Sequence, residues 1–189
     1  MPPLLIQRPR FQLCDFKSTD RAAFLRYQMD PRYLRLYDFS EKDVGRAEEL
    51  FDRFLEWQGE VPRCNFQIGI FENVTGGLLG CAGLRKADGE LAVLGIELAP
   101  AEWGRFRLAV DVAATLLAFG FETLKLQTII GDTASGNSRV EKLARWFGAE
   151  IVARRKGPEW MQARGWQEVD WAIARADWEQ SLEGIAFQH

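Results

Sequence analysis

Apolar residues follow two spacings along the chain, and the two alternate from segment to segment. Alternation at every second position, or a short apolar run between turn residues, predicts strands over residues 10–16, 66–71, 78–84, 91–98, 126–131, 150–155 and 167–174. Recurrence at every third or fourth position predicts helices over residues 18–30, 41–57, 105–124, 138–147 and 175–182. Hairpin-like strand pairs mixed with strands joined through helices predict a mixed, α+β-like α/β fold, with one sheet and helices on both faces.

The predicted helix boundaries depend on a few capping residues. The first helix is expected to end before Pro31, because the residue before a proline disfavours helical backbone. Ser40 to Asp43 resembles a capping box, with Ser40 as N-cap and Asp43 at the third helical position. The helix over residues 105–124 carries few charges, so we expect it to be buried against the sheet.

Composition narrows the class of protein. The chain has 189 residues, of which 47% are hydrophobic and 27% charged, so a disordered chain and a coiled coil are excluded. No apolar run approaches the ~20 residues of a membrane span, and residues 1–6 are too short for a signal-peptide core. The 24 Lys and Arg residues do not exceed the 27 Asp and Glu residues, which disfavours a nucleic-acid partner. We expect a single domain with neither a membrane nor a nucleic-acid partner, located in the cytoplasm.

Cysteine and histidine content limits the chemistry further. Cys14, Cys64 and Cys81 are an odd number at wide spacings, which predicts neither a disulfide framework nor a metal-binding pair. The single histidine is His189, the last residue, so a catalytic triad or a histidine-ligated metal is not expected. We therefore expect no metal, and chemistry that uses carboxylates, backbone amides and a bound cofactor.

Glu97 is the first candidate functional residue. It stands near the end of the apolar strand 91–98, where a lone carboxylate is costly unless it faces a cleft or a partner. The alternative interpretation is an exposed strand-end glutamate or one half of an ion pair.

The segment after this strand is the second candidate. Residues 101–107 lead into a long helix, and the N-terminus of a helix presents unpaired N–H groups and partial positive charge that suit a pyrophosphate. Gly104 would allow close approach of the backbone, and Arg105 and Arg107 would add charge. The alternative is an ordinary turn with two solvated arginines. Asn137, before the helix over residues 138–147, is either an N-cap or a ligand-binding side chain.

Four strings, in this order, resemble one family. They are residues 94–100 (LGIELAP), residues 102–105 (EWGR) before a long apolar helix, Asn137 with Gly148 eleven residues later, and residues 168–171 (EVDW) before Asp177 and Trp178. Together they resemble the GNAT superfamily of acyl-CoA-dependent N-acyltransferases over about residues 8 to 180. The branch they resemble most contains the ribosomal-protein N-terminal acetyltransferases.

The resemblance implies one N-acyltransferase domain over residues 1–189, with a twisted, mostly antiparallel sheet of about seven strands. It implies an N-acetyltransferase that moves an acetyl group from acetyl-CoA to a primary amine, of a small molecule or a peptide, by direct attack in a ternary complex. In that family Glu97 would be the general base, and Asn137 would contact the pantetheine arm or its carbonyl. The other positions that would bind the cofactor are Leu98, Ala99, Trp103, Gly104, Arg105, Phe106 and Arg107.

The sequence departs from the family pattern at the phosphate turn. Phe106 stands where the last glycine of that turn is expected. The tyrosine that often acts as general acid in the family is absent, and Trp146 and Phe147 occupy its region of the sequence. These departures motivate a second hypothesis, a catalytically degenerate domain that binds or senses acyl-CoA. A third is an interaction module without a nucleotide cofactor. From the tryptophans near the C-terminus we also expect a homodimer.

Overall fold

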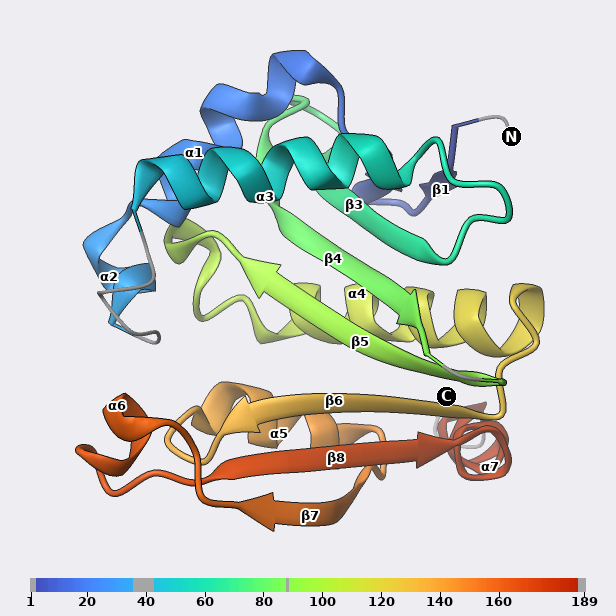
Figure 1. Ribbon diagram of the computed structural model, residues 1–189. Coiled ribbons are helices and arrows are strands. Elements are labelled where there is room, and N and C mark those ends of the chain that lie inside the picture. The colour runs from blue at the N-terminus through green and yellow to red at the C-terminus, as the bar shows by residue number, and fades with distance from the viewer. Residues whose placement is uncertain (1–2, 36–42, 88, 187–189) are drawn as a thin grey trace. The chain divides into compact units, whose positions relative to one another are not determined.

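The computed structural model describes residues 3–35, 43–87 and 89–186, with side chains up to residue 180. Eight strands form one sheet in the order β1-β2-β3-β4-β5-β6-β8-β7 (Figure 1). Their bounds are β1 Leu5–Gln7, β2 Phe11–Cys14, β3 Asn65–Glu72, β4 Leu78–Lys86, β5 Leu91–Leu98, β6 Thr128–Ala134, β7 Glu150–Arg155 and β8 Glu168–Ala174. The pair β5·β6 is parallel, whereas β1·β2, β2·β3, β3·β4, β6·β8 and β7·β8 are antiparallel. This confirms the α/β class and the mostly antiparallel sheet, but with eight strands instead of about seven, because β1 was not predicted.

The helices of the described residues are α1 Arg21–Gln28, α2 Pro31–Leu34, α3 Val44–Trp57, α4 Phe106–Ala118, α5 Ser138–Trp146, α6 Glu159–Gln162 and α7 Arg175–Ala186. After α4 the chain continues in a π-helical turn, Phe119–Thr123, so the helix predicted to reach residue 124 changes its winding at Ala118. None of these helices is both long and apolar enough to cross a membrane.

The predicted start of α3 was wrong, whereas α1 ends before Pro31 as predicted. The N-cap of α3 is Asp43, whose Oδ1 accepts a hydrogen bond from Arg46 N at 2.8 Å, so Asp43 precedes the helix instead of lying inside it. The rest of the expected capping box, residues 40–42, lies outside the described residues. Pro31, expected only to end a helix, also begins α2, where the missing N–H of a proline costs nothing at the first helical position.

The chain divides into two compact units. The first comprises the described residues of 1–85 and 95–106, and α1 and α3 pack against each other in it, with α3 on β3 (Figure 1). Its core is aromatic, with Phe16 at the centre. The ring centroids of Phe24, Phe51, Phe54 and Phe71 lie 5.2 to 6.2 Å from that of Phe16. Edge-on and offset ring pairs of this kind add to the free energy of burial, so α1, the helix that carries Tyr27 and Gln28, is held firmly in this unit.

The second unit comprises residues 86–94 and 107–189, and in it Arg175 closes the π-helical turn. The Arg175 guanidinium donates to the carbonyl oxygens of Phe121 and Leu126, with Nη2 2.9 Å from Leu126 O. Phe121 lies in the last turn of this segment and Leu126 just after it, where carbonyl oxygens lack partners within a helix, so the arginine satisfies both. The Phe121 ring in turn packs against Trp178 of α7, at 5.3 Å between centroids.

Candidate functional site

The Glu97 carboxylate, near the end of β5, is bonded through one of its two oxygens. Gln28 Nε2 donates to Glu97 Oε2 at 2.8 Å, and Tyr27 Oη lies 3.4 Å from the same oxygen. The Cys81 thiol, on β4, is 3.6 Å from Oε2. Among the described residues, no hydrogen bond reaches Oε1. Glu97 is therefore neither an isolated strand-end side chain nor half of an ion pair, the two alternatives considered from the sequence.

Two of these neighbours are weak acids that stay protonated. Burial raises the pKa of the Tyr27 phenol well above its usual value, and the adjacent Cys81 and Glu97 raise it further. Burial also raises the pKa of the Cys81 thiol, again with a contribution from the Glu97 carboxylate. The phenol and the thiol lie 3.2 Å apart. At neutral pH both are therefore protonated, and each has a proton that it can donate towards Glu97 Oε2.

Gln28 is the closest of these partners and is almost completely buried, at 1% exposure. Its two amide protons go to Glu97 Oε2 and to the hydroxyl of Tyr33 on α2, the latter at 3.2 Å. Its carbonyl oxygen Oε1 is buried without a hydrogen-bond partner among the described residues. Both amide protons of Gln28 are therefore used to hold the side chains of Glu97 and Tyr33, whereas its carbonyl oxygen is left without a partner among the described residues.

Gly80, on β4, allows the backbone of β5 to approach closely beside Glu97. Its φ is +153°, and a Cβ placed there would lie 2.0 Å from Glu97 O and 2.9 Å from Leu98 Cα. Neither backbone atom can yield without moving β5. The absence of a side chain at position 80 therefore fixes where Glu97 sits.

We expect Gly80→Ala to lower the free energy of unfolding by about 2–4 kcal/mol, because the new methyl group meets main chain and the φ is unfavourable. Urea denaturation measures this, and turnover should fall as well. Gly95→Ala is the matched control on β5, since its nearest atom would be Arg85 Nη2 at 3.9 Å, an ordinary contact. Equal stabilities for the two variants would contradict the assigned role of Gly80.

The two backbone candidates at the end of β5 differ in their hydrogen bonds. Ala99 N–H donates to Leu79 O at 2.8 Å, so this amide is already committed to β4. Because successive N–H groups of a strand point to opposite sides, that of Leu98 is directed away from β4. Leu98 O accepts from the Trp103 indole Nε1 at 2.9 Å. Trp103 thereby braces the turn that follows the strand, packed against the aromatic core of the first unit.

The predicted phosphate turn has the backbone geometry that requires a glycine. Gly104 adopts φ +97° and has open space where a side chain would stand. Arg105 forms an ion pair with Glu102 on the short helical turn Pro100–Glu102. Phe106 N–H donates to Gly104 O at 2.9 Å, and Phe106 is the first residue of α4. The turn is thus tight and exposed at Gly104, and Arg105 is half-exposed.

The two predicted residues of the second unit are placed as follows. Arg107, in the first turn of α4, pairs with Asp111 at 3.0 Å, and its side chain is 73% exposed. Exposed pairs of this kind contribute about 0–1 kcal/mol, so an anion can compete for the arginine. Asn137 is at the N-cap position of α5, but its side chain does not cap the helix. Its main-chain carbonyl oxygen accepts hydrogen bonds from the N–H groups of Val140 and Glu141. The Asn137 amide is therefore not consumed by the alternative role considered from the sequence.

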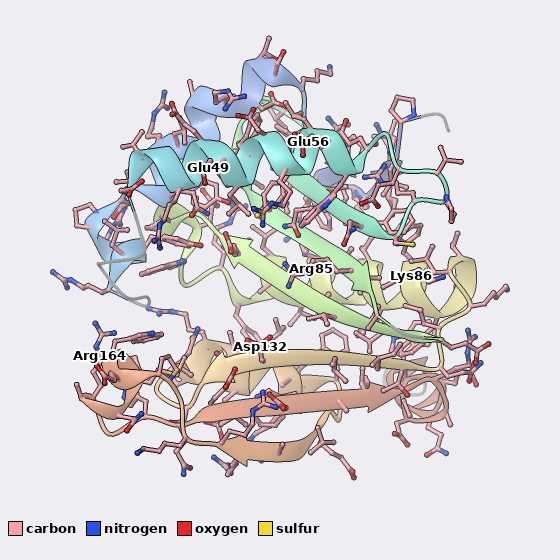
Figure 2. All side chains as sticks on the ribbon, viewed as in Figure 1. Glu49, Glu56, Arg85, Lys86, Asp132 and Arg164 are labelled. Carbon is pink, nitrogen blue, oxygen red and sulfur yellow. The ribbon has the colours of Figure 1, made fainter. Side chains whose placement is uncertain are left out.

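A cavity of about 320 Å³ opens between α1 and α3. Its wall is formed by Gln28, Met29, Asp43, Arg46, Ala47, Glu49, Leu50 and Arg53. Glu49 can be located on α3 in Figure 2. The two carboxylates and two guanidinium groups balance, so the cavity has no excess charge. Gln28 belongs both to this wall and to the group of side chains around Glu97, which links the two.

Metal chemistry has no visible site in the part of the chain that the structure describes. No three histidine, cysteine, aspartate or glutamate side chains there are grouped so that they could hold a metal ion.

Comparison with known proteins identifies the family. The family model described as "Acetyltransferase (GNAT) domain" matches residues 10–150. The chain belongs to the GNAT acetyltransferase family. This confirms the family to which the sequence motifs point, and the family is one of enzymes that transfer acetyl groups.

Solved GNAT structures share the fold at low sequence identity. Ribosomal-protein-S5-alanine acetyltransferase from Vibrio fischeri is 14% identical over 93% of this chain and 98% of that chain, with a TM-score of 0.75. Spermidine N-acetyltransferase from Vibrio cholerae, in complex with CoA and spermine, is 14% identical over 90% and 99%, with a TM-score of 0.74. A GNAT-family acetyltransferase from Bacillus anthracis is 18% identical over 90% and 98%, with a TM-score of 0.73. At these identities the likeness shows the fold alone. The first of these structures is a ribosomal-protein acetyltransferase, from the branch that the sequence resembles.

Sequence reasoning proposed Glu97 as a candidate but did not indicate the side chains that contact it. Tyr27 and Gln28 lie on a helix 70 and 69 residues before Glu97, and nothing in their spacing points to a distant strand. Cys81 carried no pairing or metal-binding signal in the sequence; it is buried, at 1% exposure, and its thiol faces Glu97. The one usable signal was Gln28 itself, a polar residue on the apolar face of a helix.

Proposed function

We propose that this GNAT protein is an N-acetyltransferase that moves the acetyl group of acetyl-CoA to a primary amine by direct attack in a ternary complex. The observation that carries the proposal is the half-bonded Glu97 carboxylate at the end of β5: Oε2 is held by donors from α1 and β4, while Oε1 accepts no hydrogen bond among the described residues. We also propose that both units belong to one acyltransferase domain over residues 1–189.

The residues present fit acetyl-CoA. Gly104, with its positive φ before α4, suits a diphosphate at a helix N-terminus, and Arg105 and Arg107 lie in weak, exposed ion pairs that a phosphate can replace. The Leu98 N–H, directed away from β4, is the donor we assign to the acyl carbonyl, and the uncommitted Asn137 side chain is assigned to the pantetheine arm. The thioester supplies the activated acyl group.

Glu97 then has one task, which is to accept a proton at Oε1, directly or through a water molecule. An α-amino group with a pKa near 7.8 is neutral in roughly 1 of 7 molecules at pH 7, but a lysine-type amine in only about 1 of 2,500. Removing the surplus proton is therefore a larger part of the reaction for strongly basic amines. Leu98 N–H stabilises the negative charge that develops on the carbonyl oxygen. No covalent intermediate on the protein is involved.

Two measurements test this function. Calorimetric titration with acetyl-CoA should show binding, and release of free CoA should be seen with a panel of α-amino peptides, lysine analogues and polyamines. The spermine complex of the Vibrio cholerae relative supports including polyamines in the panel. Absence of heat at high protein concentration would refute the proposal. Binding without turnover of any amine would leave only acyl-CoA binding.

We expect Gly104→Val to weaken acetyl-CoA binding about tenfold or more, because a β-branched residue strains a backbone at φ +97° and distorts the turn. Gly76→Val is the matched control, since Gly76 also has a positive φ, +69°, and open space, but lies in the hairpin between β3 and β4. Calorimetry on both variants measures the effect. Unchanged affinity in Gly104→Val would mean that the diphosphate binds elsewhere.

A further inference from the structure

We infer that Gln28 is the positioning residue of this site: it holds Glu97 through Oε2 so that Oε1 is left as the proton acceptor. The inference rests on the proposed function, in which Glu97 is the general base. The geometry supplies the argument. Every hydrogen bond to this carboxylate among the described residues ends on Oε2, and the shortest, at 2.8 Å, comes from Gln28.

The orientation of the Gln28 amide follows from the charge of its neighbour. An ionised carboxylate can only accept, so the amide must present Nε2 to Glu97. The second Nε2 proton is used by Tyr33 Oη at 3.2 Å, which leaves no freedom for the amide to turn. Tyr33 lies on α2 and is 2% exposed, so the support for Gln28 is itself rigid.

Fold stability does not explain why a glutamine stands here. Gln28 is 1% exposed, and its Oε1 is buried without a partner among the described residues, an arrangement that costs free energy. Methionine has a similar length and could fill the same space without an unsatisfied acceptor. A polar residue in this place is therefore explained by what its donors do, and the strongest of these donors orients Glu97.

Among the described residues, the titratable groups that contact the Glu97 carboxylate are the Tyr27 phenol from α1 and the Cys81 thiol from β4. Burial raises the pKa of both, so both are protonated at neutral pH. No described lysine or arginine bonds to Glu97. The hydrogen bond from Gln28 can therefore be removed without changing the charge of a neighbouring group.

The test is carboxyl ¹³C NMR, at neutral pH, of protein labelled in its glutamate side chains. The Glu97 resonance is the one that Glu97→Gln removes. In Gln28→Met we expect the Glu97 carboxyl resonance to move, because the carboxylate loses its closest hydrogen-bond donor. The kcat should fall about tenfold from misorientation of the base, whereas KM for the amine should stay within about twofold.

Tyr33→Phe is the matched control, because it removes the second acceptor of the Gln28 amide and keeps the contact with Glu97. We expect its Glu97 resonance to stay at the wild-type position, and both variants to melt within a few degrees of wild type. An unmoved Glu97 resonance in Gln28→Met would overturn the inference, as would an equal displacement in Tyr33→Phe. If Glu97→Gln retained full turnover, the base would be lost from the proposed function, whereas the NMR measurement would still decide whether Gln28 holds Glu97.

Discussion

Replacing Glu97 with glutamine is expected to lower kcat about 10²–10⁴-fold, the usual contribution of a positioned general base. Glutamine has the same shape but cannot accept a proton at the position of Oε1. The loss should be larger for a lysine-type acceptor than for an α-amino acceptor, because the first is almost entirely protonated at pH 7. Rates of CoA release with the two acceptors at saturating acetyl-CoA measure the difference.

Glu56→Gln is the control for this substitution. Glu56 is exposed on α3 (Figure 2), and changing it removes the same charge without touching the site. Its turnover should match wild type. If Glu97→Gln and wild type turned over both acceptors at equal rates, Glu97 would have no part in the proton transfer.

The largest expected effect on stability comes from the buried ion pair between Asp15 and Arg63. Their side chains are 7% and 4% exposed, and two parallel hydrogen bonds of 2.6 and 2.9 Å join them. Asp15 also accepts from Leu4 N, and Arg63 donates to Asn65 O, so the pair ties β1, β2 and β3 together. Asp15→Ala leaves a buried guanidinium without its partner, and we expect the free energy of unfolding to fall by about 3–5 kcal/mol.

Urea denaturation measures this loss, with Asp30→Ala as the control. Asp30 pairs with Arg32 at 2.8 Å, but there the side chains are 23% and 56% exposed, so we expect a clearly smaller loss, made up of a weak surface pair and a helix cap. The double substitution Asp15→Leu with Arg63→Met should recover part of the stability, because no charge remains buried. Equal losses in Asp15→Ala and Asp30→Ala would contradict this account.

Apolar periodicity predicted the long elements of this fold and missed the shortest ones. The strands of the β3–β4 hairpin are mostly apolar segments of eight and nine residues and were predicted, whereas β1 has three residues, Leu5–Gln7, and exists through its pairing with β2. The one-turn helices α2 and α6 are too short to show a period. Their formation depends on local capping, as Asp30 Oδ1 accepting from Arg32 N illustrates.

The candidate site was predicted along one stretch of chain only. Glu97 was chosen because a carboxylate at the end of an apolar strand is unusual, and the glycine turn was expected at Gly104, whose φ is positive. Tyr27, Gln28 and Cys81 could not be found, because their chemistry arises from a packing contact between α1, β4 and β5 that no spacing in the sequence encodes. The pairing of Arg105 with Glu102 also depends on side-chain geometry that the string EWGR does not determine.

The close contact between Gly80 and β5 limits how the surroundings of Glu97 could be redesigned. Mutant libraries should keep position 80 constant, since any larger residue would displace Glu97 along with the strand. Met29 and Leu50 of the cavity wall make none of the hydrogen bonds around Glu97, so substitutions at these two positions leave that arrangement in place.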